Sequence, residues 1–157
     1  GAGHVGRAVA HLAHWLGFYV IVSDDRAELC TAENVPEADA YYPLPMVELP
    51  AHIDVNRWMA IVLTTRGSDV DVEGLPALLD TPASYIGVIG SRRRWEITRK
   101  QLLERGVSAE QLARVHSPIG LELNAETPEE IAVSILAEIL MLKLGGHGRA
   151  MSRRGKE

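Results

Sequence analysis

The sequence predicts an α/β fold in which helices cover both faces of a mostly parallel, doubly wound sheet. Short apolar runs at residues 18–23, 58–64 and 85–90 alternate with longer amphipathic stretches, which is the order expected of consecutive βαβ units. The second and third runs are continuously apolar, as is typical of parallel strands buried on both faces. A glycine turn with the pattern G-x-G-x-x-G opens the chain at residues 1–6. Together these features indicate a Rossmann-like domain.

Capping residues and apolar runs set the boundaries of the predicted elements. Ser91 is placed to cap one helix, Ser108 and Gln111 have the spacing of a capping box, and so do Thr127 and Glu130. The predicted helices cover residues 4–16, 71–79, 91–104, 108–114 and 127–143, with a helical turn at 27–30. The predicted strands cover residues 18–23, 40–42, 58–64, 85–90 and 115–118, and residues 31–57 are otherwise irregular.

Length and composition restrict the class of protein. The 157 residues suit one domain, which we expect at residues 1–144, followed by a disordered basic tail at 145–157. A net charge of −5 argues against a general nucleic-acid partner, and no apolar run is long enough to cross a membrane. The single cysteine suits a reducing compartment, so we expect the cytoplasm.

The start of the sequence is unusual for this fold, because the glycine turn normally follows a β-strand. Here the turn begins at the first residue, so the first strand of the sheet is lacking. We expect either that upstream sequence has been removed or that another segment fills the centre of the sheet.

The glycine turn predicts a site for an anionic, phosphate-bearing ligand. Gly1 allows a tight turn, Gly3 lets a phosphate approach the backbone, and Gly6 lets the following helix pack closely; the N-terminal amides of that helix add a positive field. Asp24, at the end of the next predicted strand, is placed to accept hydrogen bonds from an adenosine ribose, which would favour NAD over NADP. Alternatively the glycines only form a tight turn. His4 either contacts the ligand or faces solvent.

A second group of anion-binding residues follows the strand at 85–90. Gly90, Ser91, Arg92, Arg93 and Arg94 bring backbone amides, a hydroxyl and three guanidinium groups to the start of a helix. Because consecutive arginines cannot all face one way on a helix, we expect Ser91 and either Arg92 or Arg93 to contact the ligand. The alternative is a solvated basic helix start.

A third turn, at residues 64–69, belongs to the same edge of the predicted sheet. Arg66 is a candidate ligand contact there, and Asp69 or Asp71 is its expected ion-pair partner; the alternative is an ordinary loop. The sequence contains no Ser-His-Asp order, zinc-ligand spacing or P-loop. It therefore assigns no catalytic and no metal-ligating residue.

Five segments, in this order, resemble the C-terminal Rossmann domain of the XdhC/CoxI family of xanthine dehydrogenase accessory factors. They are GAGHVGRAVAHLA, VIVSDDRAE, the TTRG turn, YIGVIGSRRR and PIGLELNAETPEEIAVSILAEI, and they cover nearly the whole chain up to about Leu144. The sequence departs from the family at Ser68, where members often have histidine, and at Asn124-Ala125, where they often have Gly-Ala.

The resemblance implies a role in the maturation of a molybdenum enzyme. Family members bind the molybdenum cofactor (Moco), aid its sulfuration with a cysteine desulfurase and hand it to a xanthine dehydrogenase-type hydroxylase, as chaperones rather than catalysts. Self-association is common among them, which makes a homodimer an expected state. The competing interpretations are a NAD-dependent oxidoreductase and a nucleotide-sensing domain. Carried over by position, the expected cofactor-binding residues are Gly1, Gly3, His4, Gly6, Asp24, Asp25, Arg66, Gly90, Ser91, Arg92 and Arg93.

Overall fold

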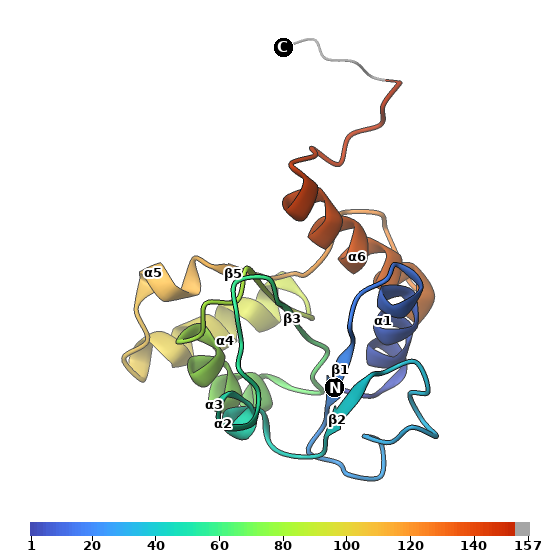
Figure 1. Ribbon diagram of the computed structural model, residues 1–157. Coiled ribbons are helices and arrows are strands. Elements are labelled where there is room, and N and C mark those ends of the chain that lie inside the picture. Colours follow the sequence, from blue (N-terminus) through green and yellow to red (C-terminus); the bar gives the residue numbers. More distant parts are fainter. Residues whose placement is uncertain (153–157) are drawn as a thin grey trace.

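The computed structural model describes residues 1–152, with parallel strands between two layers of helices (Figure 1). Helices α1 and α6 pack against each other in one layer, and α3 packs against α4 in the other. The helices are α1 (His4–Trp15), the 3-10 helix η1 (Met46–Glu48), α2 (Leu49–His52), α3 (Ser68–Leu79), α4 (Arg92–Glu104), α5 (Ala109–Leu112) and α6 (Pro128–Leu144). The strands are β1 (Ile21–Ser23), β2 (Ala40–Tyr42), β3 (Ala60–Leu63), β4 (Tyr85–Val88) and β5 (Val115–His116).

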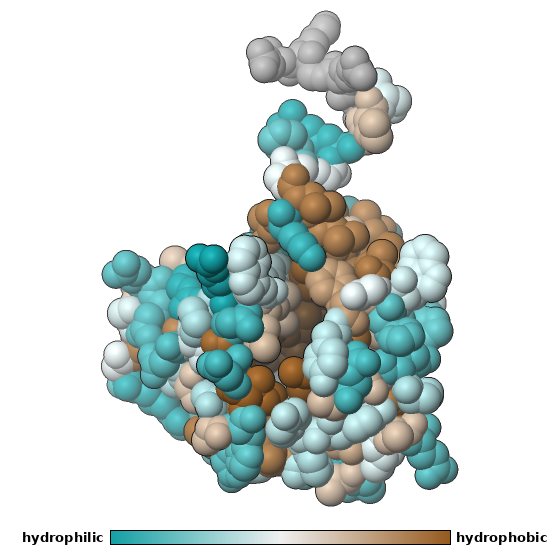
Figure 2. Space-filling view, in the orientation of Figure 1, coloured by the Kyte–Doolittle hydropathy of each residue, from teal (hydrophilic) through white to brown (hydrophobic). Residues whose placement is uncertain are grey.

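The strands form two parallel sheets instead of one. β1 pairs with β2, and β3, β4 and β5 pair in that order. Residues 1–152 supply no strand between β1 and β3, and Figure 2 shows a hollow with hydrophobic walls between the two halves of the molecule. The predicted doubly wound parallel architecture is confirmed, with an interruption at the position that the first strand of a Rossmann sheet occupies.

Side chains of the three-stranded sheet alternate between the two helical layers. Leu63 and Ile86 belong to the core that α3 and α4 complete, whereas Val62 and Tyr85 pack in the core beneath α1 and α6. Both faces of these strands are therefore covered. This explains why their sequences are continuously apolar and lack a polar face.

Three predicted helix starts are confirmed by their caps. Ser91 Oγ accepts a hydrogen bond from the Arg94 N–H at 3.1 Å, and the capping boxes of Ser108 with Gln111 and of Thr127 with Glu130 are both complete. Each satisfies amide groups that the first turn of a helix leaves without partners.

Other predictions need correction. The first strand begins at Ile21, so residues 18–20 are not part of it, and the predicted irregular segment 31–57 contains η1 and α2. Helix α3 begins at Ser68, three residues before the predicted start.

Residues 145–152 contain neither helix nor strand, and the remainder of the predicted disordered tail, residues 153–157, lies outside the described residues. None of the described helices combines the length and apolar character that a membrane crossing requires.

The capping box of α6 gives a direct test of this fold. Thr127→Ala is expected to lower the free energy of unfolding by about 1 kcal/mol, because it removes the hydroxyl that accepts from the Glu130 N–H. Urea denaturation followed by circular dichroism measures the change. Thr127→Ser keeps the hydroxyl and is the matched control; equal destabilisation by both substitutions would contradict the assigned cap.

Candidate functional site

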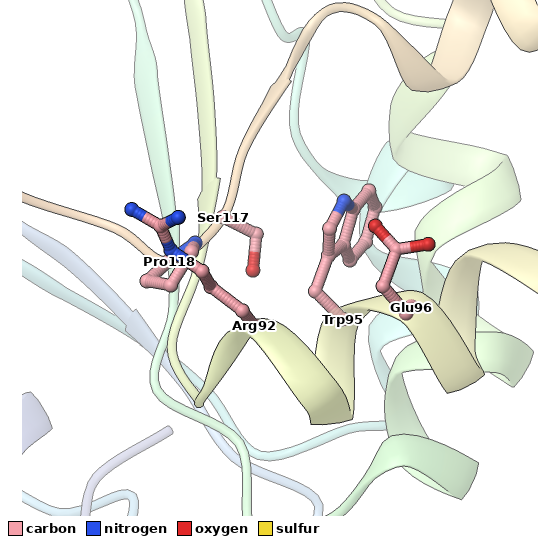
Figure 3. A pocket seen from close by; sticks show the side chains of 5 residues that line it. All are labelled: Arg92, Trp95, Glu96, Ser117 and Pro118. Atoms are coloured by element: carbon pink, nitrogen blue, oxygen red, sulfur yellow. The ribbon is translucent and has the colours of Figure 1, made fainter.

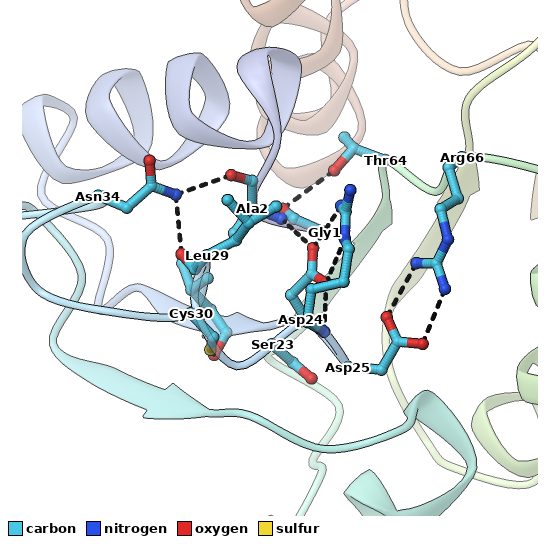
Figure 4. A network of polar contacts seen from close by, with 12 residues as sticks. Gly1, Ala2, Ser23, Asp24, Asp25, Leu29, Cys30, Asn34, Thr64 and Arg66 are labelled. Carbon is cyan, nitrogen blue, oxygen red and sulfur yellow. Dashed lines mark hydrogen bonds and ion pairs between the residues drawn. The ribbon is translucent and has the colours of Figure 1, made fainter.

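Three turns at the carboxyl ends of the strands are joined by hydrogen bonds. Thr64 Oγ1, just after β3, donates to the Gly1 carbonyl at 3.2 Å, and the Ala2 N–H donates to Asp24 Oδ2, just after β1, at 2.8 Å. Arg94 Nη2, in the first turn of α4, donates to Thr65 Oγ1 at 2.8 Å. The glycine turn thus lies between the ends of β1 and β3, as Figure 4 shows. Arg94 joins the turn after β4 to the turn after β3.

The geometry of the glycine turn leaves room for a ligand at Gly3. A Cβ atom at Gly6 would lie 2.0 Å from the Gly1 carbonyl oxygen, so only glycine fits there. At Gly3 a Cβ atom would meet nothing within 4 Å. Gly3 is the N-cap residue of α1, and no side chain from the described part of the chain caps that helix. The first turn of α1 therefore begins beside open space at the Cβ position of Gly3, and His4 is exposed at the helix start.

Asp24 holds the glycine turn and is already saturated with donors. Its carboxylate accepts four hydrogen bonds, from the Ala2 N–H and from the N–H, Nε and Nη2 of Arg26, which fills the roughly four acceptor positions of a carboxylate. The residue is 6% exposed. A ribose could use Asp24 only after displacing Arg26.

The ionisation of Asp24 follows from these contacts. Burial opposes the charged form, but the hydrogen bonds from the Arg26 side chain and from the Ala2 and Arg26 amides outweigh it and hold the pKa of Asp24 well below its usual value. Asp24 is therefore a structural anion at neutral pH, and its charge is compensated inside the site.

Asp25 and Arg66 pair with each other across the ends of β1 and β3. Two parallel hydrogen bonds of 2.8 Å join the guanidinium to the carboxylate, and the bond from Arg66 is the main cause of the lowered pKa of Asp25. Both side chains stay partly exposed, at 38% for Asp25 and 47% for Arg66. The predicted pairing of Arg66 with Asp69 or Asp71 is wrong, because Asp71 has another partner.

That partner is Arg94, which the sequence analysis did not single out as a contact. Arg94 Nη2 lies 2.7 Å from Asp71 Oδ2, and the Asp71 side chain is fully buried. Thr65 Oγ1 also donates to Asp71. Gly90, with φ of +133°, gives the Arg94 stem its space, since a Cβ there would lie 2.8 Å from Arg94 Cδ. Of the three consecutive arginines, Arg94 is thus committed to holding the turns together.

The other residues at the start of α4 remain accessible. Ser91, Arg92 and Arg93 are exposed, and within residues 1–152 neither Arg92 nor Arg93 forms an ion pair. Their guanidinium groups stand at a helix N-terminus, where cations are unfavourable, so an anionic ligand would relieve that repulsion. Among the described residues, no three His, Cys, Asp or Glu side chains are arranged to hold a metal ion.

Comparison with known families identifies the chain. Residues 1–139 match the model of the XdhC Rossmann domain. The chain belongs to this family. The match includes the glycine turn, the end of β1, the turn after β3 and the start of α4, so the four linked segments described above are part of the XdhC Rossmann domain itself.

Relatives of this XdhC Rossmann domain are longer proteins. The chain is 36% identical to the uncharacterized protein YqeB of Escherichia coli, covering 98% of the chain and 28% of YqeB. It is 34% identical to a probable component of xanthine dehydrogenase from Bacillus subtilis, covering 91% of the chain and 41% of that protein. It is 28% identical to the molybdenum cofactor insertion chaperone PaoD of Escherichia coli over 60% of the chain and 29% of PaoD. The chain therefore spans less than half the length of these relatives.

A solved structure supports the same assignment. The crystal structure of a xanthine dehydrogenase from Bacillus halodurans superposes with a TM-score of 0.80 at 30% identity, covering 92% of this chain and 43% of that one.

The Arg94–Asp71 pair should behave as a buried ion pair. Arg94→Met is expected to lower the free energy of unfolding by about 3 kcal/mol, because it leaves the buried carboxylate without a cation. Urea denaturation measures the loss. The double variant Arg94→Met/Asp71→Leu should recover much of it, and the exposed Arg93→Met is the control; equal stability of Arg94→Met and Arg93→Met would refute the structural role.

The depressed pKa of Asp24 predicts an acid-dependent stability. A carboxylate whose pKa is lowered by folding stabilises the fold above its unfolded value of about 4, and this contribution is lost as the pH falls further. Asp24→Asn is expected to cost about 2 kcal/mol at pH 7 and to reduce the loss of stability in acid. Denaturation curves from pH 7 to pH 3 test both, with the exposed Asp54→Asn as control; an unchanged pH profile for Asp24→Asn would contradict the linkage.

Proposed function

We propose that this XdhC Rossmann domain binds the molybdenum cofactor and serves the maturation of a xanthine dehydrogenase-type hydroxylase. Two relatives support this role by name, one a probable component of xanthine dehydrogenase and the other a molybdenum cofactor insertion chaperone. In the proposed sequence of events the domain holds the cofactor, a cysteine desulfurase sulfurates it, and the hydroxylase receives it. The domain acts as a chaperone, and a homodimer is its proposed assembly.

The observation that carries the proposal is the open, uncapped start of α1 beside Gly3. Moco is a pterin that carries a phosphate, and a helix N-terminus with free amides binds such an anion. The space at Gly3 and the absence of a side-chain cap provide that place. The residues proposed to hold the phosphate are Gly3 and His4, with the amides of the first turn of α1.

The contacts of Asp24 favour this proposal over a NAD-dependent oxidoreductase. A dinucleotide bound in the usual way needs a carboxylate with free acceptor positions for the ribose hydroxyls. Asp24 gives all of its positions to Ala2 and Arg26. A phosphate at the α1 N-terminus requires no change in this arrangement.

The location of Cys30 supports a separate sulfur donor. Cys30 is the single cysteine of the chain, is 5% exposed, and its thiol donates to the Val22 carbonyl at 3.5 Å. It is therefore unsuited to carry a reactive sulfur at the surface. This is why the proposal includes a cysteine desulfurase as partner.

Gly3 allows a test in which stability and binding change in opposite directions. Gly3→Asp is expected to fold normally, because its Cβ has space, φ is −76°, and aspartate is a favourable N-cap. Its charge and its own capping hydrogen bond should weaken Moco binding at least tenfold by repelling the phosphate. Molybdenum content and fluorescence of the oxidised pterin, measured after equilibration with isolated Moco, report the binding.

Gly3→Asn is the matched control, since it has nearly the same shape and capping ability without the charge. It should retain more Moco than Gly3→Asp. Failure of the unmodified chain to bind Moco would overturn the proposed function. Equal Moco binding by the unmodified chain and both variants would contradict the placement of the phosphate at the glycine turn.

A further inference from the structure

A pocket lies on the same edge, between the first turns of α4 and the segment after β5. It has a volume of about 310 Å³ and is lined by Arg92, Trp95, Glu96, Ser117 and Pro118. Figure 3 shows Arg92 and Pro118 on one side, Trp95 and Glu96 on the other, and the Ser117 hydroxyl between them. Its volume is at the small end of the range of about 300–1,000 Å³ for small-molecule sites, so it suits one ring system.

The charged groups of this pocket are available for a ligand. Arg92 and Glu96 are four residues apart on α4, a spacing at which such side chains often pair. Within residues 1–152 they form no ion pair with each other or with any other residue. The pocket therefore offers a cation on one wall and an anion on the other.

The remaining walls add an aromatic surface and a further acceptor. Trp95 is half-buried and packs against the core of α3 and α4, which fixes its indole ring at the pocket. Ser117 Oγ donates its hydrogen to the Val88 carbonyl at 3.0 Å, so the same oxygen can serve a ligand only as an acceptor. Glu96 and Ser117 can accept hydrogen bonds while Arg92 donates them.

The geometry points to a 2-amino-4-oxopyrimidine ring, as found in pterins, as the ligand of this pocket. Such a ring presents adjacent N–H donors that a carboxylate accepts in pairs, a carbonyl that a guanidinium can bind, and a flat face for the indole. A bare phosphate is disfavoured because Glu96 would repel it. This inference rests on the proposed function, which supplies a pterin, and it divides the cofactor between two places on the edge.

The distance between the two places suits that division. The glycine turn lies at the gap beside β3, and the pocket lies at the ends of β4 and β5. Neighbouring strands are about 4.8 Å apart, which separates the two places by roughly 10–15 Å. An extended ligand could place its ring beside Trp95 and its phosphate at Gly3.

The test compares unsubstituted pterin with lumazine, in which a carbonyl replaces the 2-amino group. The full chain is expected to bind the pterin about tenfold more tightly, because lumazine cannot donate the paired hydrogen bonds to Glu96. Glu96→Gln should abolish this preference. Glu104→Gln, exposed on the same helix but outside the pocket, should keep it. Quenching of ligand fluorescence gives the affinities, and unfolding curves check that each variant folds.

Absence of pterin binding, an equal affinity for both rings, or an unchanged preference in Glu96→Gln would overturn the pocket assignment. A parallel measurement of Moco binding separates this failure from that of the proposed function. If the unmodified chain binds Moco and Glu96→Gln binds it equally well, the pocket assignment fails and the carrier function stands. If the unmodified chain binds no Moco, the proposed function fails.

Discussion

The Asp71 carboxylate is fully buried near the start of α3, and the candidate site depends on how its charge is compensated. An isolated carboxylate at that depth would be very costly. Arg94 reaches it from α4 and Thr65 from the turn after β3. Because Thr64 holds the Gly1 carbonyl, the same short segment fixes the glycine turn. The buried ion pair therefore joins the start of α4 to the segment between β3 and α3, and Thr64 extends this connection to the glycine turn.

The ion pairs at this edge decide which charged groups remain for a ligand. Asp24 is neutralised by Arg26, Asp25 by Arg66, and Asp71 by Arg94. What remains at the edge is a set of backbone amides at the start of α1 and, in the first turns of α4, exposed guanidinium groups with the Glu96 carboxylate beside them. The anion-binding surface is thus smaller than the sequence alone suggested, and it lies within an acidic chain whose net charge is −5.

The sequence predicted the parts of this architecture that depend on local rules. Ser91, Ser108 and Thr127 cap helices through residues three positions away. Such short spacings can be recognised in the sequence without knowledge of the fold. The partner of Arg66 was mistaken and Arg94 was not singled out, because both depend on which turns meet across the sheet. The strand predicted at 18–23 is too long, because residues 18–20 lie outside the ladder with β2, the one neighbour that β1 has within residues 1–152.

The weakness of the single contacts at this edge agrees with the proposed carrier role. An exposed guanidinium contributes little to binding in water, typically under about 1 kcal/mol for each pair, and amides at a helix N-terminus add a modest dipolar attraction. A ligand held by several such contacts is retained as long as all of them act together. It is released when a partner surface competes for a few of them, which is the behaviour that delivery of a cofactor to another protein requires.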